Sequence, residues 1–131
     1  MFLHRLSPDQ QRVFIGLAKN FIEVDAIVEV AEAEALQRMQ AETGISIAST
    51  EPLPPTAENL AVFETPESRA AVMLELVALA YGDGDVHPRE NVAIQEVATV
   101  FEIPTEKLLQ MEGWVVRHRA LLREAEHLLA E

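Results

Sequence analysis

Three acidic side chains and one histidine gather within eight positions of the sequence, at residues 83–90. Asp83, Asp85 and Glu90 supply carboxylate oxygens, which hard divalent cations bind where several of them converge. His87 would add a nitrogen, the ligand type that favours zinc and other transition metals. The stretch therefore predicts a cation site, and its oxygen-rich composition puts Ca²⁺, Mg²⁺ or Mn²⁺ ahead of Zn²⁺.

A second acidic stretch carries the same spacing earlier in the chain. Residues 25–32 repeat the pattern Asp-x-x-Val-x-x-x-Glu of residues 83–90. If the fold brings the two stretches together, Asp25 and Glu32 join the same site. The site is not an EF-hand, because that loop needs a bidentate acid where this chain has Ile94.

The same residues also have a purely structural interpretation. Gly84 would supply a positive φ for a tight turn, and Pro88 would occupy the first position of a new helix. With His87 as N-cap, Glu90 falls at the third helical position, where a carboxylate interacts with unpaired backbone N–H groups and the helix dipole. Glu32 fits this role equally well, so capping and cation binding both remain open.

Helices are the elements that must position these acids. Apolar residues recur at three-and-four spacing after Ser7-Pro8-Asp9, a typical helix start. The apolar run Ala70–Tyr81 predicts a central helix whose one charge is Glu75. Further helices are expected over residues 32–43, 56–63 and 88–101, and from Pro104. We expect a bend or break at Gly113, followed by a last helix whose Trp114, His118, Leu121, Leu122, Ala125, Leu128 or Leu129 face inward.

The chain repeats itself with an offset of 58 positions, the separation of Asp25 and Asp83. At that offset the helix start at residues 7–9 falls on Thr65-Pro66-Glu67. The sequence therefore predicts an all-α helical bundle of two pseudo-symmetric hairpins plus short linking helices. We expect one domain over residues 1–131, with repeats at about 7–45 and 65–103, a proline-rich loop insertion at 46–55 and a C-terminal helix at 114–130.

The two helical hairpins, the second of which turns through residues 83–90, resemble the tellurite-resistance TerB-like family, to which the N-terminal domain of DjlA-type co-chaperones is related. The resemblance covers most of the chain, with the proline-rich loop outside it. The family pattern is an apolar helix running into Asp-Gly-x-Val-x-x-x-Glu, and residues 83, 84, 86 and 90 match it. The first repeat keeps Asp25, Val28 and Glu32 but has Ala26 in place of the glycine. This resemblance implies an all-helical fold, acidic residues that bind metal ions, and a role in systems linked to stress and toxic oxyanions.

Composition excludes several classes of function. A net charge of −12 leaves no basic surface for a nucleic-acid backbone. The absence of cysteine excludes disulfides and thiolate chemistry. No Ser-His-Asp set, P-loop or dinucleotide fingerprint is present, so we do not expect an enzyme. Neither a signal peptide nor a membrane-spanning segment is expected, which favours a cytoplasmic protein.

Two functions follow from these features. The first is a non-enzymatic acidic module that binds divalent cations through its inter-helix turns in a stress or tellurite-resistance context. The alternative is a protein-interaction scaffold in which the acidic turns are only caps. The acidic residues between Asn20 and Glu67 suit a partner with a basic surface, and both a monomer and a homodimer fit the sequence.

Overall fold

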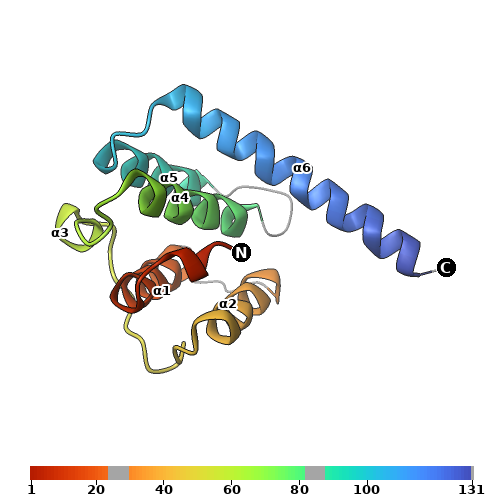
Figure 1. The fold of residues 1–131 in the computed structure, drawn as a ribbon, viewed down its shortest axis with the longest axis horizontal. Helices are drawn as coiled ribbons and strands as arrows, with labels where there is room; N and C mark the ends of the chain where they lie inside the picture. Colours follow the sequence, from red (N-terminus) through yellow and green to blue (C-terminus); the bar gives the residue numbers. More distant parts are fainter. Residues whose placement is uncertain (24–29, 82–87, 131) are drawn as a thin grey trace.

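The computed structural model describes residues 1–23, 30–81 and 88–130 of the 131-residue chain. Within these ranges the backbone forms six α-helices and one 3₁₀ helix, with no β-strand. The elements are η1 Leu3–Arg5, α1 Pro8–Glu23, α2 Val30–Thr43, α3 Ala57–Leu60, α4 Pro66–Ala80, α5 Pro88–Val100 and α6 Thr105–Leu129 (Figure 1). The predicted all-α class is confirmed.

The helix starts repeat at the predicted offset. Helices α1 and α4 begin at Pro8 and Pro66, and helices α2 and α5 begin at Val30 and Pro88, so both pairs are 58 residues apart. Helix α1 packs against α2, and α4 packs against α5. The two halves of the chain therefore form the two helical hairpins that the sequence predicts.

Matching caps fix the first helix of each hairpin. The Ser7 hydroxyl accepts a hydrogen bond from the backbone N–H of Gln10 at 3.2 Å, and the Gln10 side chain accepts one from the Ser7 N–H at 2.9 Å. Thr65 and Ser68 form the same reciprocal pair, at 3.1 and 3.2 Å. Each pair satisfies backbone donors that a helix start leaves without intrahelical partners.

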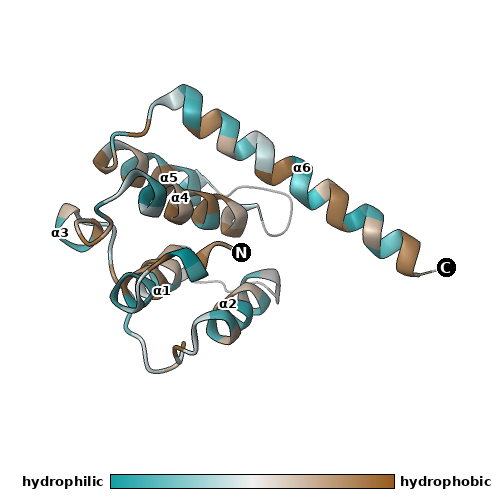
Figure 2. Cartoon of the chain, in the orientation of Figure 1, coloured by the Kyte–Doolittle hydropathy of each residue, from teal (hydrophilic) through white to brown (hydrophobic). Residues whose placement is uncertain are grey.

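Helix α4 is the centre of the molecule, as its apolar sequence predicts. It packs against α1, α5, α6 and η1, and the side chains of Val72, Met73 and Val77 are fully buried. Hydrophobic residues follow one another along it with few interruptions (Figure 2). The hairpins are thus held together by one helix that is buried on most of its faces.

The predicted loop insertion is irregular and packs on α1. It follows Gly44, whose φ of +75° ends α2 in the conformation that glycine adopts most readily. The Leu53 N–H donates to the Gly16 carbonyl at 2.9 Å, and the Lys19 ammonium donates to the Ile47 and Thr50 carbonyls at 3.0 and 2.7 Å. These contacts explain why the loop is ordered without secondary structure of its own.

Helix α6 corrects two predictions. The expected break at Gly113 is wrong, and so is a C-terminal helix that starts at residue 114, because α6 runs without interruption from Thr105 to Leu129. Glycine costs a helix only about 1 kcal/mol relative to alanine. The buried residues Leu108, Met111 and Val115 lie on both sides of Gly113, so their packing holds α6 continuous through it.

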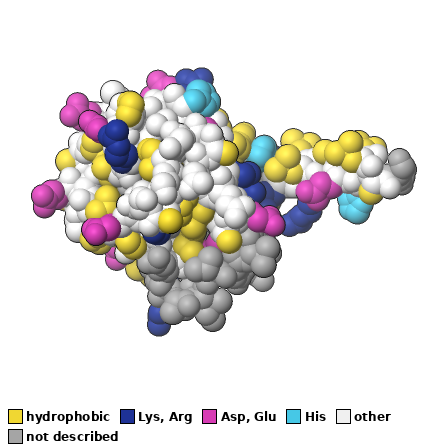
Figure 3. Space-filling view, turned by 90° about the horizontal axis from the view of Figure 1, so that it is seen from below, with side chains coloured by type: hydrophobic (Ala, Val, Ile, Leu, Met, Phe, Trp, Pro, Cys, Tyr) yellow, Lys and Arg dark blue, Asp and Glu magenta, His cyan; other side chains and the backbone are white. Residues whose placement is uncertain are grey.

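A third correction, beyond the two about Gly113 and the start of the helix, concerns which face of the last helix is buried. Trp114 and His118 are half-buried, but every residue of 120–129, which we name the α6 arm, is exposed. The expected inward leucines Leu121, Leu122, Leu128 and Leu129 have exposed fractions of 62%, 52%, 76% and 85%. The arm projects from the body and carries hydrophobic side chains along its length (Figure 3). No helix of the described residues, α6 included, has the length and apolar character needed to cross a membrane.

Candidate functional site

The structure describes two of the six predicted ligand residues, Glu32 and Glu90. Glu32 is the third residue of α2 and Glu90 is the third residue of α5. Both side chains are buried, each with 8% of its surface exposed. A glutamate is rarely buried unless it is paired or ligated, because burial of a charged carboxylate costs free energy. Each hairpin buries one such carboxylate, at the third residue of its second helix.

Burial distinguishes these two glutamates from the other acids at helix starts. Asp9 in α1, Glu67 in α4 and Glu106 in α6 also lie in the first turn of their helices, and all three are exposed. A favourable interaction with the helix dipole therefore does not require a buried carboxylate. Burial therefore sets Glu32 and Glu90 apart from the other first-turn acids, and both glutamates have interaction partners within the chain.

The other four predicted ligands, Asp25, Asp83, Asp85 and His87, lie outside the described residues. Among the residues that are described, no group of three or more histidine or acidic side chains is arranged to hold a metal ion. The cation site thus stays a prediction, with two of its members seen as buried carboxylates at the starts of equivalent helices.

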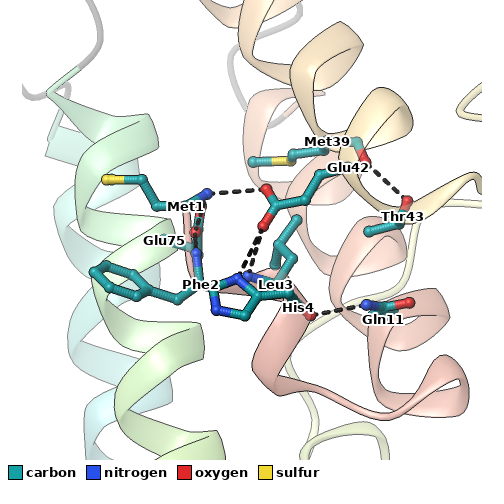
Figure 4. A network of polar contacts seen from close by, with 9 residues as sticks. All are labelled: Met1, Phe2, Leu3, His4, Gln11, Met39, Glu42, Thr43 and Glu75. Carbon is teal, nitrogen blue, oxygen red and sulfur yellow. Dashed lines mark hydrogen bonds and ion pairs between the residues drawn. The ribbon is translucent and has the colours of Figure 1, made fainter.

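A second cluster of carboxylates was not foreseen from the sequence. The Met1 ammonium lies 2.9 Å from both Glu42 Oε2 and Glu75 Oε1 (Figure 4). The Phe2 N–H donates to Glu75 Oε1 at 2.7 Å, and the Leu3 N–H donates to Glu42 Oε1 at 3.1 Å. The two acids therefore bind the first turn of the chain, and Glu75 is only 5% exposed.

The pairing shifts the pKa values of the groups in this cluster. Partial burial alone would lower the pKa of the Met1 ammonium, but hydrogen bonds and charge attraction from Glu42 and Glu75 outweigh it and raise the pKa above 8.0. Burial would raise the pKa of Glu42, but the hydrogen bonds and charge of the ammonium and the hydrogen bonds from His4 lower it below 4.5. Both shifts favour the charged pair. The only sequence signal for the cluster was a single charge in an apolar helix, which requires a partner.

Beside this cluster lies a groove of about 630 Å³, which we name the α2/α6 groove. Met1, α2, α4 and α6 line it, and its apolar residues are Met1, Ala35, Met39, Ala78, Leu79 and Leu122. Charged side chains of both signs surround these residues, among them Glu34 and Arg123. Among the described residues that line the groove there is no serine, threonine or cysteine.

The N-terminal segment contacts α6 through aromatic rings, and one residue of this group, His118, also lines the groove. The Phe2 ring lies 5.7 Å from the Trp114 ring, centroid to centroid, and the His118 ring stacks on Trp114 at 5.0 Å with an interplanar angle of 9°. His118 is thus the half-buried packing residue that its position predicts. The imidazole ring stacks parallel to the indole of Trp114 at the edge of the hydrophobic core.

The family model described as tellurite resistance protein TerB matches residues 19–112 of this chain. The matched range begins within α1, includes both acidic stretches, residues 25–32 and 83–90, and ends within α6, before the α6 arm. No curated protein and no solved structure matches the chain.

Proposed function

Because the chain belongs to the TerB family of tellurite resistance proteins, we propose that it is a non-enzymatic acidic module that binds a divalent cation. In this proposal Glu32 and Glu90 supply carboxylate oxygens at the starts of α2 and α5. Asp25, Asp83 and Asp85 are the further oxygen ligands, and His87 is a nitrogen ligand. An oxygen-rich set of this kind favours Ca²⁺, Mg²⁺ or Mn²⁺ over Zn²⁺, and the setting is a stress or tellurite-resistance response.

The observation that supports this proposal is the burial of two equivalent glutamates. Glu32 and Glu90 occupy the same position in the two hairpins, and each is 8% exposed. Placing a carboxylate in a weakly solvated environment is costly, and a nearby cation offsets that cost. First-turn acids such as Glu106 are exposed, so a position in the first turn of a helix does not by itself lead to burial.

A second candidate function is a protein-interaction scaffold in which the acidic turns between the helices have only a structural role. Glu32 and Glu90 are each the third residue of a helix, where a carboxylate accepts hydrogen bonds from backbone donors of the first turn. In that case the acidic surface of the chain would bind a basic partner, and its net charge of −12 would speed the encounter.

Thermal unfolding of the full chain with and without divalent ions separates the two functions. A cation that binds the folded state at 100 times its Kd adds about 2.7 kcal/mol of stability, which raises the Tm by roughly 8 to 12 °C. We expect such a rise with Ca²⁺, Mg²⁺ or Mn²⁺, and we expect Glu90→Gln combined with Asp83→Asn to abolish it. Calorimetric titration of the same ions should give a matching Kd.

Glu106→Gln is the matched control, because it removes the charge of an exposed first-turn acid that is not one of the predicted ligands. It should keep the full ion-dependent rise in Tm. A scaffold would show neither heat nor a Tm shift with any of the ions, and Glu32→Gln and Glu90→Gln would then lower the Tm equally in buffer with and without ions.

A further inference from the structure

The described lining of the α2/α6 groove includes four glutamates, two of which are held by the start of the chain. Glu42 and Glu75 each lie 2.9 Å from the Met1 ammonium (Figure 4). Their Oε1 atoms also accept hydrogen bonds from the Leu3 and Phe2 N–H groups, at 3.1 and 2.7 Å. These two carboxylates are therefore engaged within the chain, and the charges that remain for a ligand are those of the other lining residues.

Arginines predominate among those other lining residues. Arg38 comes from α2, and Arg119 and Arg123 come from α6, whereas the remaining acids are Glu34 and Glu126. Within the part of the chain that the structure describes, Arg38 and Arg123 form no ion pair, and Arg119 has a contact in the chain. The chain as a whole has 22 acidic and 10 basic residues. The local excess of arginine is thus the reverse of the overall charge, and it favours an anion in the groove.

Apolar side chains lie next to these arginines. Met39 of α2, Leu79 of α4 and Leu122 of α6 line the same groove, and its volume of about 630 Å³ falls in the usual range of small-molecule sites. An arginine guanidinium binds a carboxylate through two parallel hydrogen bonds. A ligand that satisfies both parts of the lining has one anionic end and one apolar chain.

We propose that the α2/α6 groove binds a single soluble amphipathic carboxylate of the medium-chain fatty-acid type. Arg38 and Arg123 are exposed, and their long side chains bind the carboxylate. The alkyl chain packs on the apolar side chains of α2, α4 and α6. Glu32 and Glu90 are not among the residues that line the groove, so this proposal does not depend on cation binding at the acidic turns.

Calorimetric titration of the full chain with decanoate, kept below its micelle concentration, is the first test. We expect a Kd of about 100 μM, which the usual binding energy per atom allows for a ligand of this size. Octanoate should bind about 10-fold more weakly, because it buries two methylene groups fewer. Decanol and decyltrimethylammonium should bind at least about 10-fold more weakly than decanoate, because neither has an anion for the arginines.

Trp114 provides a second measurement of the same binding. It is the only tryptophan of the chain, and His118, whose ring stacks on it at 5.0 Å, lines the groove. Occupation of the groove should therefore change the tryptophan fluorescence, with the Kd that calorimetry gives.

Substitutions test the two parts of the lining separately. Arg38→Gln with Arg123→Gln should weaken decanoate binding by at least about 10-fold and leave decanol binding unchanged. Arg117→Gln is the matched control, because Arg117 is an exposed α6 arginine outside the groove lining. Ala35→Phe fills part of the groove and should weaken both ligands. Circular dichroism of each variant should match the wild type, because the substituted side chains are exposed or only partly buried.

Three results would overturn the proposal: no heat with decanoate at about 1 mM, a concentration ten times the expected Kd; decanol that binds as tightly as decanoate; or equal effects of the control and of the double arginine substitution. Acetate or inorganic phosphate that binds as tightly as decanoate would also contradict it and indicate a site for an adventitious ion only. Binding to vesicles of anionic phospholipid without binding of monomeric decanoate would contradict it in favour of a membrane surface.

Discussion

Glu75 is a charged residue inside an apolar helix, and its contacts hold the N-terminal segment in place. It lies in the most buried helix of the protein, with 5% of its surface exposed. Its carboxylate contacts the Met1 ammonium and the Phe2 N–H, which tie the start of the chain to α4. Phe2 in turn lies against Trp114 of α6. The charge of Glu75 therefore positions the N-terminal segment that borders the α2/α6 groove.

Glu75→Gln should lower the free energy of unfolding by about 1.5 kcal/mol, because a buried charge-assisted contact becomes a neutral one. Chemical denaturation measures the change. Glu67→Gln serves as the control, since the Glu67–Arg5 pair at 2.6 Å is exposed on both sides, and its loss should cost about 0.5 kcal/mol or less. Equal effects of the two substitutions would contradict the role assigned to Glu75.

At the scale of helices, two glycines have opposite roles. Gly44 ends α2 with a φ of +75°, and a Cβ there would be strained although nothing lies within 4 Å of it. Gly113 lies inside α6, where a Cβ would meet only the Nη1 atom of Arg117, at 3.3 Å. A guanidinium at the end of a long side chain moves at little cost. Glycine is therefore required at residue 44 and dispensable at residue 113.

Gly113→Ala should raise the free energy of unfolding by about 0.5 to 1 kcal/mol, because alanine favours a continuous helix and reduces the entropy of the unfolded chain. Gly44→Ala should lower it by about 1 kcal/mol through the left-handed backbone. Thermal unfolding of both variants measures the difference. A loss of stability in Gly113→Ala would show that α6 bends at this residue in solution.

At the scale of the whole molecule, the charge cluster at the N-terminus sets a pH window. The pKa of the Met1 ammonium is raised above 8.0, so its contribution to stability is complete below pH 8.0 and is lost as the pH rises through the folded-state value. The pKa of Glu42 is lowered below 4.5, so its contribution is complete above pH 4.5 and is lost as the pH falls through the folded-state value.

Stability measured by urea denaturation should therefore be highest between about pH 5 and 8 and should fall on both sides. The net charge of −12 also destabilises the protein at alkaline pH through self-repulsion, so a control is needed. Glu42→Gln with Glu75→Gln removes both partners of the ammonium and should reduce the alkaline fall. An identical alkaline fall in this variant would show that the ammonium contributes nothing.

Much of the fold followed from local signals. Ser7 and Thr65 mark helix starts by their type and their neighbours, and Gly44 marks a helix end. These residues act on the backbone next to them, so the sequence was sufficient to place them. The duplication of the hairpin followed in the same way, because both copies carry the same local signals.

The candidate site was only partly predictable. Glu32 and Glu90 were identified by their spacing, but their burial depends on how α2 and α5 pack against the rest of the chain. The Glu42–Glu75 cluster joins residues that are 33 positions apart to the start of the chain, and no local pattern encodes such a contact. Leu122 was expected inside because its spacing is that of a core helix, yet the body ends before it.

The sequence by itself determined that this protein of the TerB family consists of a duplicated helical hairpin. It also determined that an acidic residue lies at the start of the second helix in each hairpin. Caps, turns and helical periodicity are local properties, and they act before any tertiary contact forms. Only the tertiary structure decided that Glu32 and Glu90 are buried and that the α6 arm is open. Burial depends on which distant surfaces meet and on where the protein body ends, and neither is written in the spacing of residues along one helix.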